Sequence, residues 1–178
     1  MAVTGITSKP EVVRYGGARE ERFAYVDGEA FEAGDLIRLT TAGEIKLAEV
    51  DSSGAGAVSG MALEAVASEV NETVAVLMFA EDTVVAIQCV DTVAPEDLAK
   101  GQTYILEYSA GTWGIPNTTT NGVATIQDFA ATGQPWADVT GTYGTSGYTG
   151  GNPITNETED NGKVLVSFAQ AILDGHAA

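Results

Sequence analysis

Carboxylates are the only chemically versatile side chains that this sequence holds in quantity. The chain has 25 Asp and Glu residues, but a single histidine and a single cysteine. Adjacent acids occur at Glu20-Glu21, Glu81-Asp82 and Glu96-Asp97, and a fourth group spans residues 157–160. Paired carboxylates hydrolyse glycosides when they face each other across a cleft, and regularly spaced carboxylates bind calcium. The full spacing of a calcium loop is absent, so we interpret these acids as solvated turn residues.

The remaining candidate groups do not form a catalytic pattern. Cys89 lies in the apolar run 83–90, where a strand would place it on one face with Val85 and Ile87. A nucleophilic cysteine needs a nearby base, and the only histidine is His176. No phosphate-binding loop or dinucleotide fingerprint is present. We therefore expect a buried structural cysteine, no catalytic residue, no enzymatic activity, no metal site and no cofactor.

Short apolar segments separated by Gly and Asx turns predict an all-β fold. Ile37 and Leu39 alternate with Leu36 and Arg38, as in a half-buried hairpin strand. The strands that we expect cover residues 23–26, 36–39, 44–48, 58–63, 74–79, 83–90, 104–108, 112–115 and 163–168, and residues 123–126 are a further candidate for a short strand. Helix is expected as single turns at 95–101 and after residue 169, while residues 65–69 fit either a helical turn or a continued strand. The pattern favours a small β-barrel or sandwich.

Residues 117–161 differ in composition from the rest of the chain. Thr, Gly, Asn and Tyr dominate there and regular periodicity fades, which is typical of an inserted loop region. Trp136, Tyr143 and Tyr148 lie in this Thr/Gly-rich insertion and are candidates for an exposed contact patch. Trp113 follows a turn inside a predicted strand pair, which favours a place in the core.

The charge of the chain is divided unevenly. Residues 1–22 carry four basic and three acidic side chains, a net charge of +1, whereas the rest carries four basic and 22 acidic, a net charge of −18. Residues 1–22 also lack a sustained period, so we predict an extended N-terminal docking arm, followed by a β-barrel body over residues 23–178. The residues expected to dock are Ile6, Lys9, Pro10, Val12, Val13, Arg14, Tyr15 and Arg19.

The overall net charge of −17 argues against several classes of partner. Nucleic acids and anionic membrane surfaces attract Lys and Arg and repel an acidic protein. No apolar run approaches the roughly 20 residues that span a bilayer, and residues 1–22 lack the apolar centre of a secretory signal. We expect a protein that binds neither nucleic acid nor membrane.

Three segments of the sequence carry a resemblance. They are Phe31-Glu32-Ala33-Gly34-Asp35 with the strand after it, Ala42-Gly43 with the strand 44–48, and Val58-Ser59-Gly60-Met61-Ala62-Leu63. In this order they resemble the head decoration (cement) proteins of tailed bacteriophages, over roughly residues 23–115 and the final strand. The resemblance implies a β-barrel module on the outer surface of the capsid. It also implies a trimer at three-fold positions, with an N-terminal arm that clamps subunits of the major capsid protein.

Two hypotheses of function follow. The first is a structural capsid decoration protein of the virion, which binds the major capsid protein through its arm as a homo-oligomer, with a trimer favoured. The alternative is a carbohydrate- or cell-surface-binding β module of a phage fibre or appendage, which would use Trp136, Tyr143 and Tyr148 for stacking. Removal of the arm should abolish capsid binding under the first hypothesis and spare glycan binding under the second.

Overall fold

The computed structural model describes residues 9–48, 57–67, 73–109, 111–129 and 162–173. Helix in these ranges is confined to the 3-10 turn η1 (Pro95–Asp97) and to α1 (Gln170–Leu173). The strands are β1 (Glu11–Arg14), β2 (Arg19–Ala24), β3 (Ala30–Phe31), β4 (Leu36–Leu39), β5 (Ile45–Leu47), β6 (Gly60–Ala62), β7 (Val66–Ala67), β8 (Thr73–Met78), β9 (Val84–Gln88), β10 (Thr103–Tyr104), β11 (Glu107–Ser109), β12 (Thr112–Gly114), β13 (Ala124–Phe129) and β14 (Lys163–Phe168). The predicted all-β fold class is confirmed.

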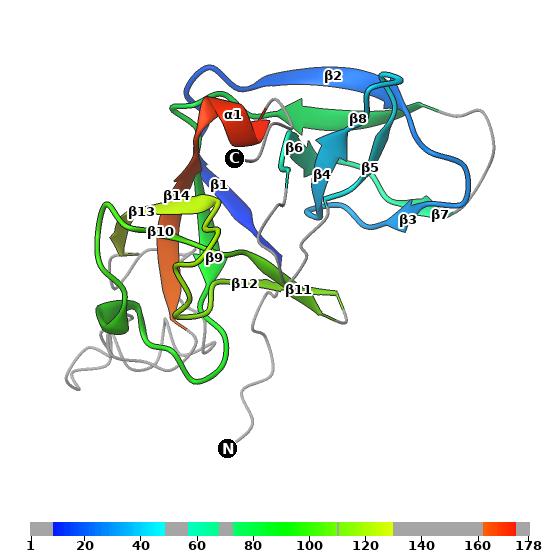
Figure 1. Cartoon of the computed structure of the whole chain (residues 1–178). Coiled ribbons are helices and arrows are strands. Elements are labelled where there is room, and N and C mark those ends of the chain that lie inside the picture. The colour runs from blue at the N-terminus through cyan, green and yellow to red at the C-terminus, as the bar shows by residue number, and fades with distance from the viewer. Residues whose placement is uncertain (1–8, 49–56, 68–72, 110, 130–161, 174–178) are drawn as a thin grey trace, which may run out of the picture.

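Two five-stranded antiparallel sheets form the body. The first has the order β1-β9-β14-β13-β10 and the second the order β2-β8-β6-β4-β5, while β11-β12 and β3-β7 form two-stranded ladders. Figure 1 shows the first sheet on one side of the molecule and the second on the other. Among the described residues the ladders leave both sheets open, although the edges of the second meet at one parallel bridge between Tyr25 and Ile45. The arrangement is sandwich-like rather than a continuous barrel.

The central strands of the second sheet bury both of their faces, and each face builds a different core. Successive side chains of a strand point to opposite faces, so neighbouring apolar residues separate into two groups. The residues that face the larger core are Leu36, Met61 and Leu77, and those that face the smaller core are Ile37, Ala62 and Val76. The larger core also contains the inner side chains of the first sheet, such as Val85, Ile87 and Val166. One sheet therefore serves as a wall between two cores.

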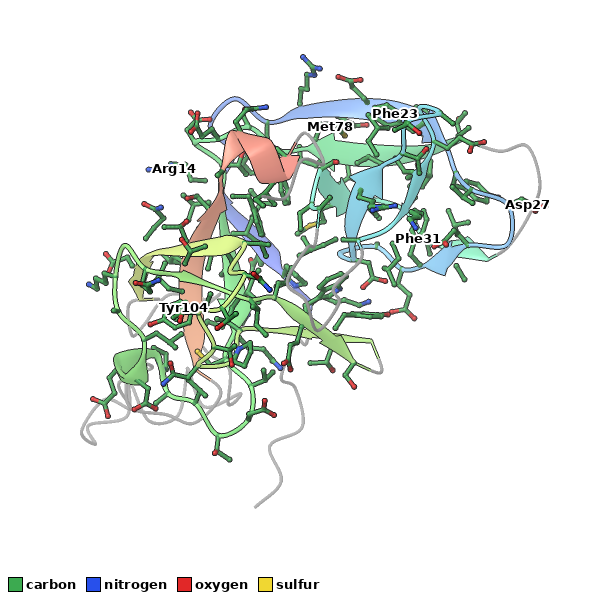
Figure 2. All side chains as sticks on the ribbon, viewed as in Figure 1. Arg14, Phe23, Asp27, Phe31, Met78 and Tyr104 are labelled. Carbon is green, nitrogen blue, oxygen red and sulfur yellow. The ribbon has the colours of Figure 1, made fainter. Side chains whose placement is uncertain are left out.

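The smaller core is closed by aromatic side chains. Tyr25 and Phe31 pack edge to face, with ring centroids 6.3 Å apart and planes at 84°. Phe23 on β2 and Met78 on β8 are partly buried against the same cluster. Figure 2 labels Phe23, Phe31 and Met78 around this core, and Tyr104 on the other side of the molecule in the larger one.

The prediction that residues 1–22 form an extended arm is wrong for the part that the structure describes. β1 pairs with β9, with Glu11 opposite Ala86 and Val12 opposite Val85. β2 pairs with β8 in unbroken register from Arg19 to Ala24. Residues 9–24 therefore belong to the body, and residues 1–8 lie outside the described residues.

The physical reason for this error is that both strands lie at sheet edges. β1 ends the order of the first sheet and β2 that of the second. An edge strand is held mainly by backbone hydrogen bonds to one neighbour, and charged side chains are common there because they discourage further pairing. Arg19, Glu20 and Arg22 are exposed accordingly. The sequence therefore shows no apolar period, although β2 pairs in unbroken register and β1 pairs with one shift of register between Val12 and Arg14.

The predicted Thr/Gly-rich insertion contains the short strand that the sequence suggested near 123–126. β13 (Ala124–Phe129) lies within the predicted range 117–161 and pairs with β14 in the first sheet. Residues 130–161, which include Trp136, Tyr143 and Tyr148, lie outside the described residues.

Gly60 is the point at which the second sheet tolerates no side chain. A Cβ atom at this position would overlap the backbone carbonyl oxygen of Leu77 on the neighbouring strand β8. We expect Gly60→Ala to lower the free energy of unfolding by at least about 2 kcal/mol, because the ladder must spread to admit a methyl group. Gly43→Ala is the matched control, since its Cβ would meet open space and only the positive φ of 81° opposes it, a cost of about 1 kcal/mol. Denaturant unfolding of both variants measures the two losses. Equal losses of unfolding free energy in Gly60→Ala and Gly43→Ala would contradict the prediction.

Candidate functional site

Asp35 is a buried carboxylate at the junction between the N-terminal segment and the body. It follows Ala33-Gly34 in the motif that carried the resemblance, and it is 1% exposed. Its Oδ2 atom accepts a hydrogen bond from the backbone N–H of Glu32 at 2.8 Å, which closes the turn before β4. A buried carboxylate must be supplied with donors or a counter-charge, because loss of hydration costs several kcal/mol. Asp35 obtains both from distant segments.

Lys9 supplies the counter-charge. Its Nζ atom donates to Asp35 Oδ1 and lies 3.4 Å from Glu32 Oε2. Burial lowers the pKa of Lys9, but the hydrogen bond and the charge of Asp35, followed by those of Glu32, outweigh it and raise the pKa above its ordinary 10.5. The ammonium group therefore fixes the start of the described chain to the body.

Trp113 on β12 completes the site. Its indole Nε1–H donates to Asp35 Oδ1 at 2.9 Å, and the side chain is fully buried. The ring of Tyr108 on β11 lies against it, with centroids 4.5 Å apart. Burial, followed by the charge of Asp35, raises the pKa of Tyr108. With three donors on its two oxygens, Asp35 acts as an anchor for the N-terminal segment and the β11-β12 hairpin.

A second contact region fixes the turn between β1 and β2 to the loop before β9. Arg14 Nε donates to the carbonyl oxygen of Asp82 at 3.0 Å, and Gly17 N donates to Asp82 Oδ1 at 2.8 Å. Thr83 Oγ1 donates to the carbonyl oxygen of Tyr15 at 2.9 Å. The N-terminal segment is thus held at Lys9 and again at residues 14–17.

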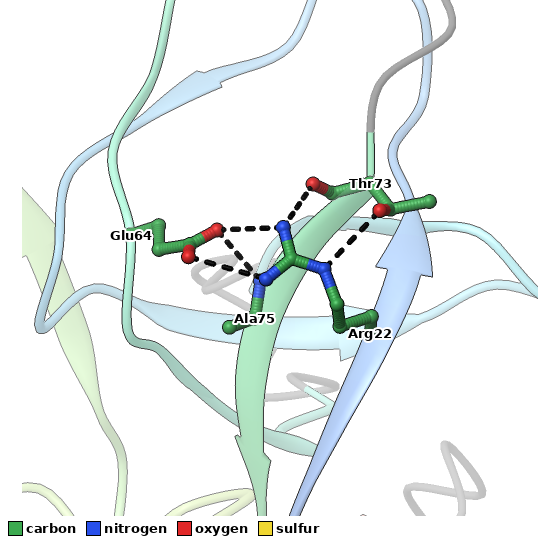
Figure 3. Close-up of polar contacts among 4 residues, drawn as sticks. All are labelled: Arg22, Glu64, Thr73 and Ala75. Carbon is green, nitrogen blue, oxygen red and sulfur yellow. Dashed lines mark hydrogen bonds and ion pairs between the residues drawn. The ribbon is translucent and has the colours of Figure 1, made fainter.

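A third contact region holds β2. The Arg22 guanidinium donates to both carboxylate oxygens of Glu64, at 3.2 and 3.1 Å, and to the carbonyl oxygen of Thr73 at 2.8 Å (Figure 3). The backbone N–H of Ala75 also donates to Glu64. The Ala75 hydrogen bond, followed by Arg22, lowers the pKa of Glu64 below its ordinary value. This exposed cluster links β2, β8 and the segment after β6.

The predicted docking residues are placed differently from one another. Pro10 is buried, Val12 and Val13 are half-buried, and Val12 packs against the larger core. Arg19 forms an ion pair with Glu21. Tyr15 alone among the described docking residues presents a large apolar side chain to solvent, at 60% exposed. Ile6 lies outside the described residues.

All eight Lys and Arg side chains of the chain interact within it. The pairs not yet mentioned are Lys100 with Asp128 and Lys163 with Glu11, while Arg38 and Lys46 also have partners. Lys9, Arg14 and Arg19, three of the residues expected to dock, each contact an oxygen of the body.

Sequence reasoning missed Asp35, Trp113 and Asp82 as the residues that position the N-terminal segment. Lys9 and Asp35 are 26 positions apart, and Asp35 and Trp113 are 78 apart. No local pattern links residues at such distances. The only available signal was the Ala33-Gly34-Asp35 turn, whose acid precedes a strand.

Comparison with known proteins leaves the family of the chain open. The sequence matches no protein-family model, and no curated protein matches it significantly.

The described residues contain no group of three or more His, Cys, Asp or Glu side chains that could hold a metal ion. Within the same ranges, no helix has the length and apolar character to span a membrane.

The Lys9 contact should give the stability of the protein a distinct pH dependence. Because the pKa of Lys9 is raised on folding, its contribution is complete below pH 10.5 and is lost as the pH rises through the folded-state pKa. We expect Lys9→Met to lower the free energy of unfolding by about 1–3 kcal/mol at neutral pH, because Asp35 loses its counter-charge. The difference from wild type should shrink above pH 10.5 in denaturant unfolding. Lys100→Met, at an exposed ion pair, is the control, and an equal loss in both variants would refute the role of Lys9.

Cys89 should be unreactive in the native protein. The side chain is fully buried, as predicted, and burial, followed by the charge of Asp97, raises the pKa of its thiol to about 12. The thiolate is the reactive form, so labelling by a thiol reagent at pH 8 should be slow in native protein and fast in denaturant. Equal labelling rates in native and denatured protein would show that Cys89 is accessible to the reagent in the native state.

Proposed function

We propose that the chain is a structural, non-enzymatic decoration protein of a phage head. In this role it binds the outer surface of the capsid as a homo-oligomer, with a trimer favoured, and stabilises contacts between subunits of the major capsid protein. The resemblance of residues 31–39, 42–48 and 58–63 to head decoration proteins motivates the proposal. The all-β fold of the body is compatible with it.

The observation that carries the proposal is the fixation of the N-terminal segment at Lys9. A segment that clamps neighbouring subunits must be coupled firmly to its own body, since otherwise strain on it is not transmitted. Lys9 is joined to Asp35 in the motif that resembles decoration proteins, Pro10 is buried, and β1 follows directly in the first sheet. Residues 1–8 would thus start from a fixed root.

This geometry revises which residues should bind the capsid. The cations at Lys9, Arg14 and Arg19 serve the chain itself, so we assign the arm contacts to residues 1–8, including Ile6, rather than to residues 1–22. Rim charges mainly govern association rate, whereas apolar anchors in a desolvated contact govern dissociation. Many copies on a symmetric shell would multiply a weak single contact.

Deletion of residues 2–8 tests the proposal. The probe is an expanded empty shell assembled from the major capsid protein that the proposal makes the partner of this chain. We expect full-length protein to bind these shells and raise their melting temperature, and the deletion to retain the fold but bind at least about tenfold more weakly.

The control is a Lys9→Met variant, which keeps residues 1–8 and removes only the contact of Lys9 with Asp35. We expect it to bind shells with a smaller loss than the deletion. Deletion of residues 2–22 is unsuitable, because it removes β1 and β2 from the two sheets. The proposed function would be overturned if the full-length protein neither bound these shells nor raised their melting temperature.

A further inference from the structure

Lys9, Asp35 and Glu32 bring an amine into contact with two carboxyl groups. Lys9 Nζ donates to Asp35 Oδ1 and lies 3.4 Å from Glu32 Oε2. The Asp35 side chain is buried, whereas both side chains of the ion pair between Lys100 and Asp128 are exposed. An amine held against a buried carboxyl group has the two parts from which an amide forms, so this contact has a chemistry that an exposed ion pair lacks.

The turn before β4 holds the Asp35 carboxyl group in one orientation. On the backbone, Asp35 N donates to the carbonyl oxygen of Glu32 at 3.1 Å, and Ala62 N donates to the carbonyl oxygen of Asp35 at 2.9 Å. On the side chain, Oδ2 accepts from the N–H of Glu32, and Oδ1 accepts from Trp113 Nε1. Both ends of the residue are therefore fixed, and its Cγ atom is held beside Lys9 Nζ.

Gly34 directs the Lys9 side chain toward Asp35. A Cβ atom at Gly34 would lie 3.3 Å from Lys9 Cβ and 3.5 Å from Lys9 Cγ, so the stem of the lysine runs along the glycine backbone. The φ of Gly34 is +89°, in the left-handed region that favours glycine. The buried Pro10 follows Lys9 directly and restricts the chain there. The amine is thus positioned by packing as well as by its charge.

The aromatic side chains of the β11-β12 hairpin shield the pair from water. Trp113 is fully buried against Asp35, and the ring of Tyr108 covers the indole. At rest the pair is ionic, since Asp35 raises the pKa of Lys9. The reactive form has a neutral amine and a neutral carboxyl group, and transfer of one proton from Nζ produces it. Burial disfavours charged forms, so a shielded site makes this transfer easier than water does.

We propose that Lys9 and Asp35 condense to an intramolecular isopeptide bond, with Glu32 as the group that transfers the proton. The bond between Lys9 Nζ and Asp35 Cγ forms, and one Cγ–O bond breaks. Two of the three ammonium protons leave with that oxygen as water, and the third remains on the amide nitrogen. Glu32 accepts a proton from Nζ and returns it to the leaving oxygen, so Glu32 itself is unchanged.

The hydrogen bonds to Asp35 also suit the intermediate of this reaction. Attack of the amine on Cγ places negative charge on a carboxyl oxygen, and the N–H groups of Glu32 and Trp113 already donate to those oxygens. Condensation of a separate amine and acid is unfavourable in water. Contact within one folded chain changes this, because effective molarities of well-oriented groups reach about 10⁵–10⁸ M.

This inference goes beyond the proposed function and does not depend on it. The bond would join the start of the described chain covalently to the turn before β4, across 26 positions of sequence. The ion pair of Lys9 is then the state before the reaction, and the pH dependence expected for it belongs to the unlinked protein.

The mass of the intact protein tests the proposal. Purified full-length protein kept for days in native buffer below its melting temperature should become lighter by one water, whereas unlinked protein kept in denaturant should not. Fragment masses after protease digestion should then show a branched peptide that joins Lys9 to Asp35.

Lys9→Arg is the matched negative control. It keeps a cation beside Asp35, but a guanidinium group stays protonated and is no nucleophile, so this variant should retain its full mass. Circular dichroism checks that it is folded. The linked wild type should melt about 5 °C or more above Lys9→Arg, because the link restricts the unfolded chain as a disulfide does.

The role of Glu32 is tested by the rate of linkage. The Glu32 side chain is exposed, so Glu32→Gln should fold normally and form the bond at least about tenfold more slowly. Glu81→Gln, at an exposed acid of the loop before β9, should form it at the wild-type rate. Linkage of Glu32→Gln at the wild-type rate would overturn the role of Glu32 and leave the bond itself standing.

Two outcomes would overturn the bond. One is native wild-type protein whose mass stays unchanged throughout the incubation. The other is a loss of water that persists in Lys9→Arg, since it must then arise elsewhere, for example from a succinimide at Asp27-Gly28. Neither measurement involves a capsid, so the proposed function is tested separately.

Discussion

A negative charge buried at Asp35 constrains how the described segments of this chain meet. A carboxylate that is 1% exposed needs charge compensation and hydrogen-bond donors, and its own turn provides only the N–H of Glu32. The other donors are Lys9, from the N-terminal segment, and Trp113, from the β11-β12 hairpin. Three segments that are far apart in the sequence must therefore converge on one side chain. Any arrangement that separates them leaves a buried charge without compensation.

The N-terminal segment connects the two sheets as well as docking on them. β1 adds to β9 in one sheet and β2 adds to β8 in the other, and the turn between them lies on the loop that joins β8 to β9. This loop and the turn cross between the sheets together, and they are joined by the hydrogen bonds of Asp82 and Thr83. The sheets are thus linked at their edges by polar contacts and at their centres by the larger core.

The basic side chains of this strongly acidic protein serve contacts within its own fold. Its eight Lys and Arg residues all interact within the chain; most of them lie on strands, and Lys9 lies at the start of the described chain. With 25 acidic residues against eight basic ones, the chain has a net charge of −17, which favours solubility and electrostatic repulsion between acidic surfaces. Attachment to a partner must then rely on apolar contacts or on basic groups that the partner supplies.

Local sequence determined the class of the fold and many of its strands. Alternation at Leu36–Leu39 and the turn pairs around it predicted β4 with the bounds that the structure has, and the apolar run at 163–168 predicted β14. The same reasoning placed Cys89 and Trp113 in the core, where both are fully buried. These features depend on neighbours one to four positions away, so they are visible in the sequence.

Only the tertiary structure decided that residues 9–24 join the two sheets and that Asp35 holds the N-terminal segment. Arg19 to Arg22 carry no apolar period, and their strand exists because β8 offers an edge of backbone donors and acceptors. Likewise, Ala33-Gly34-Asp35 is an ordinary turn until Lys9 and Trp113 reach it from 26 and 78 positions away. Edge pairing and charge compensation join residues that are distant in the sequence, and no local periodicity records such contacts.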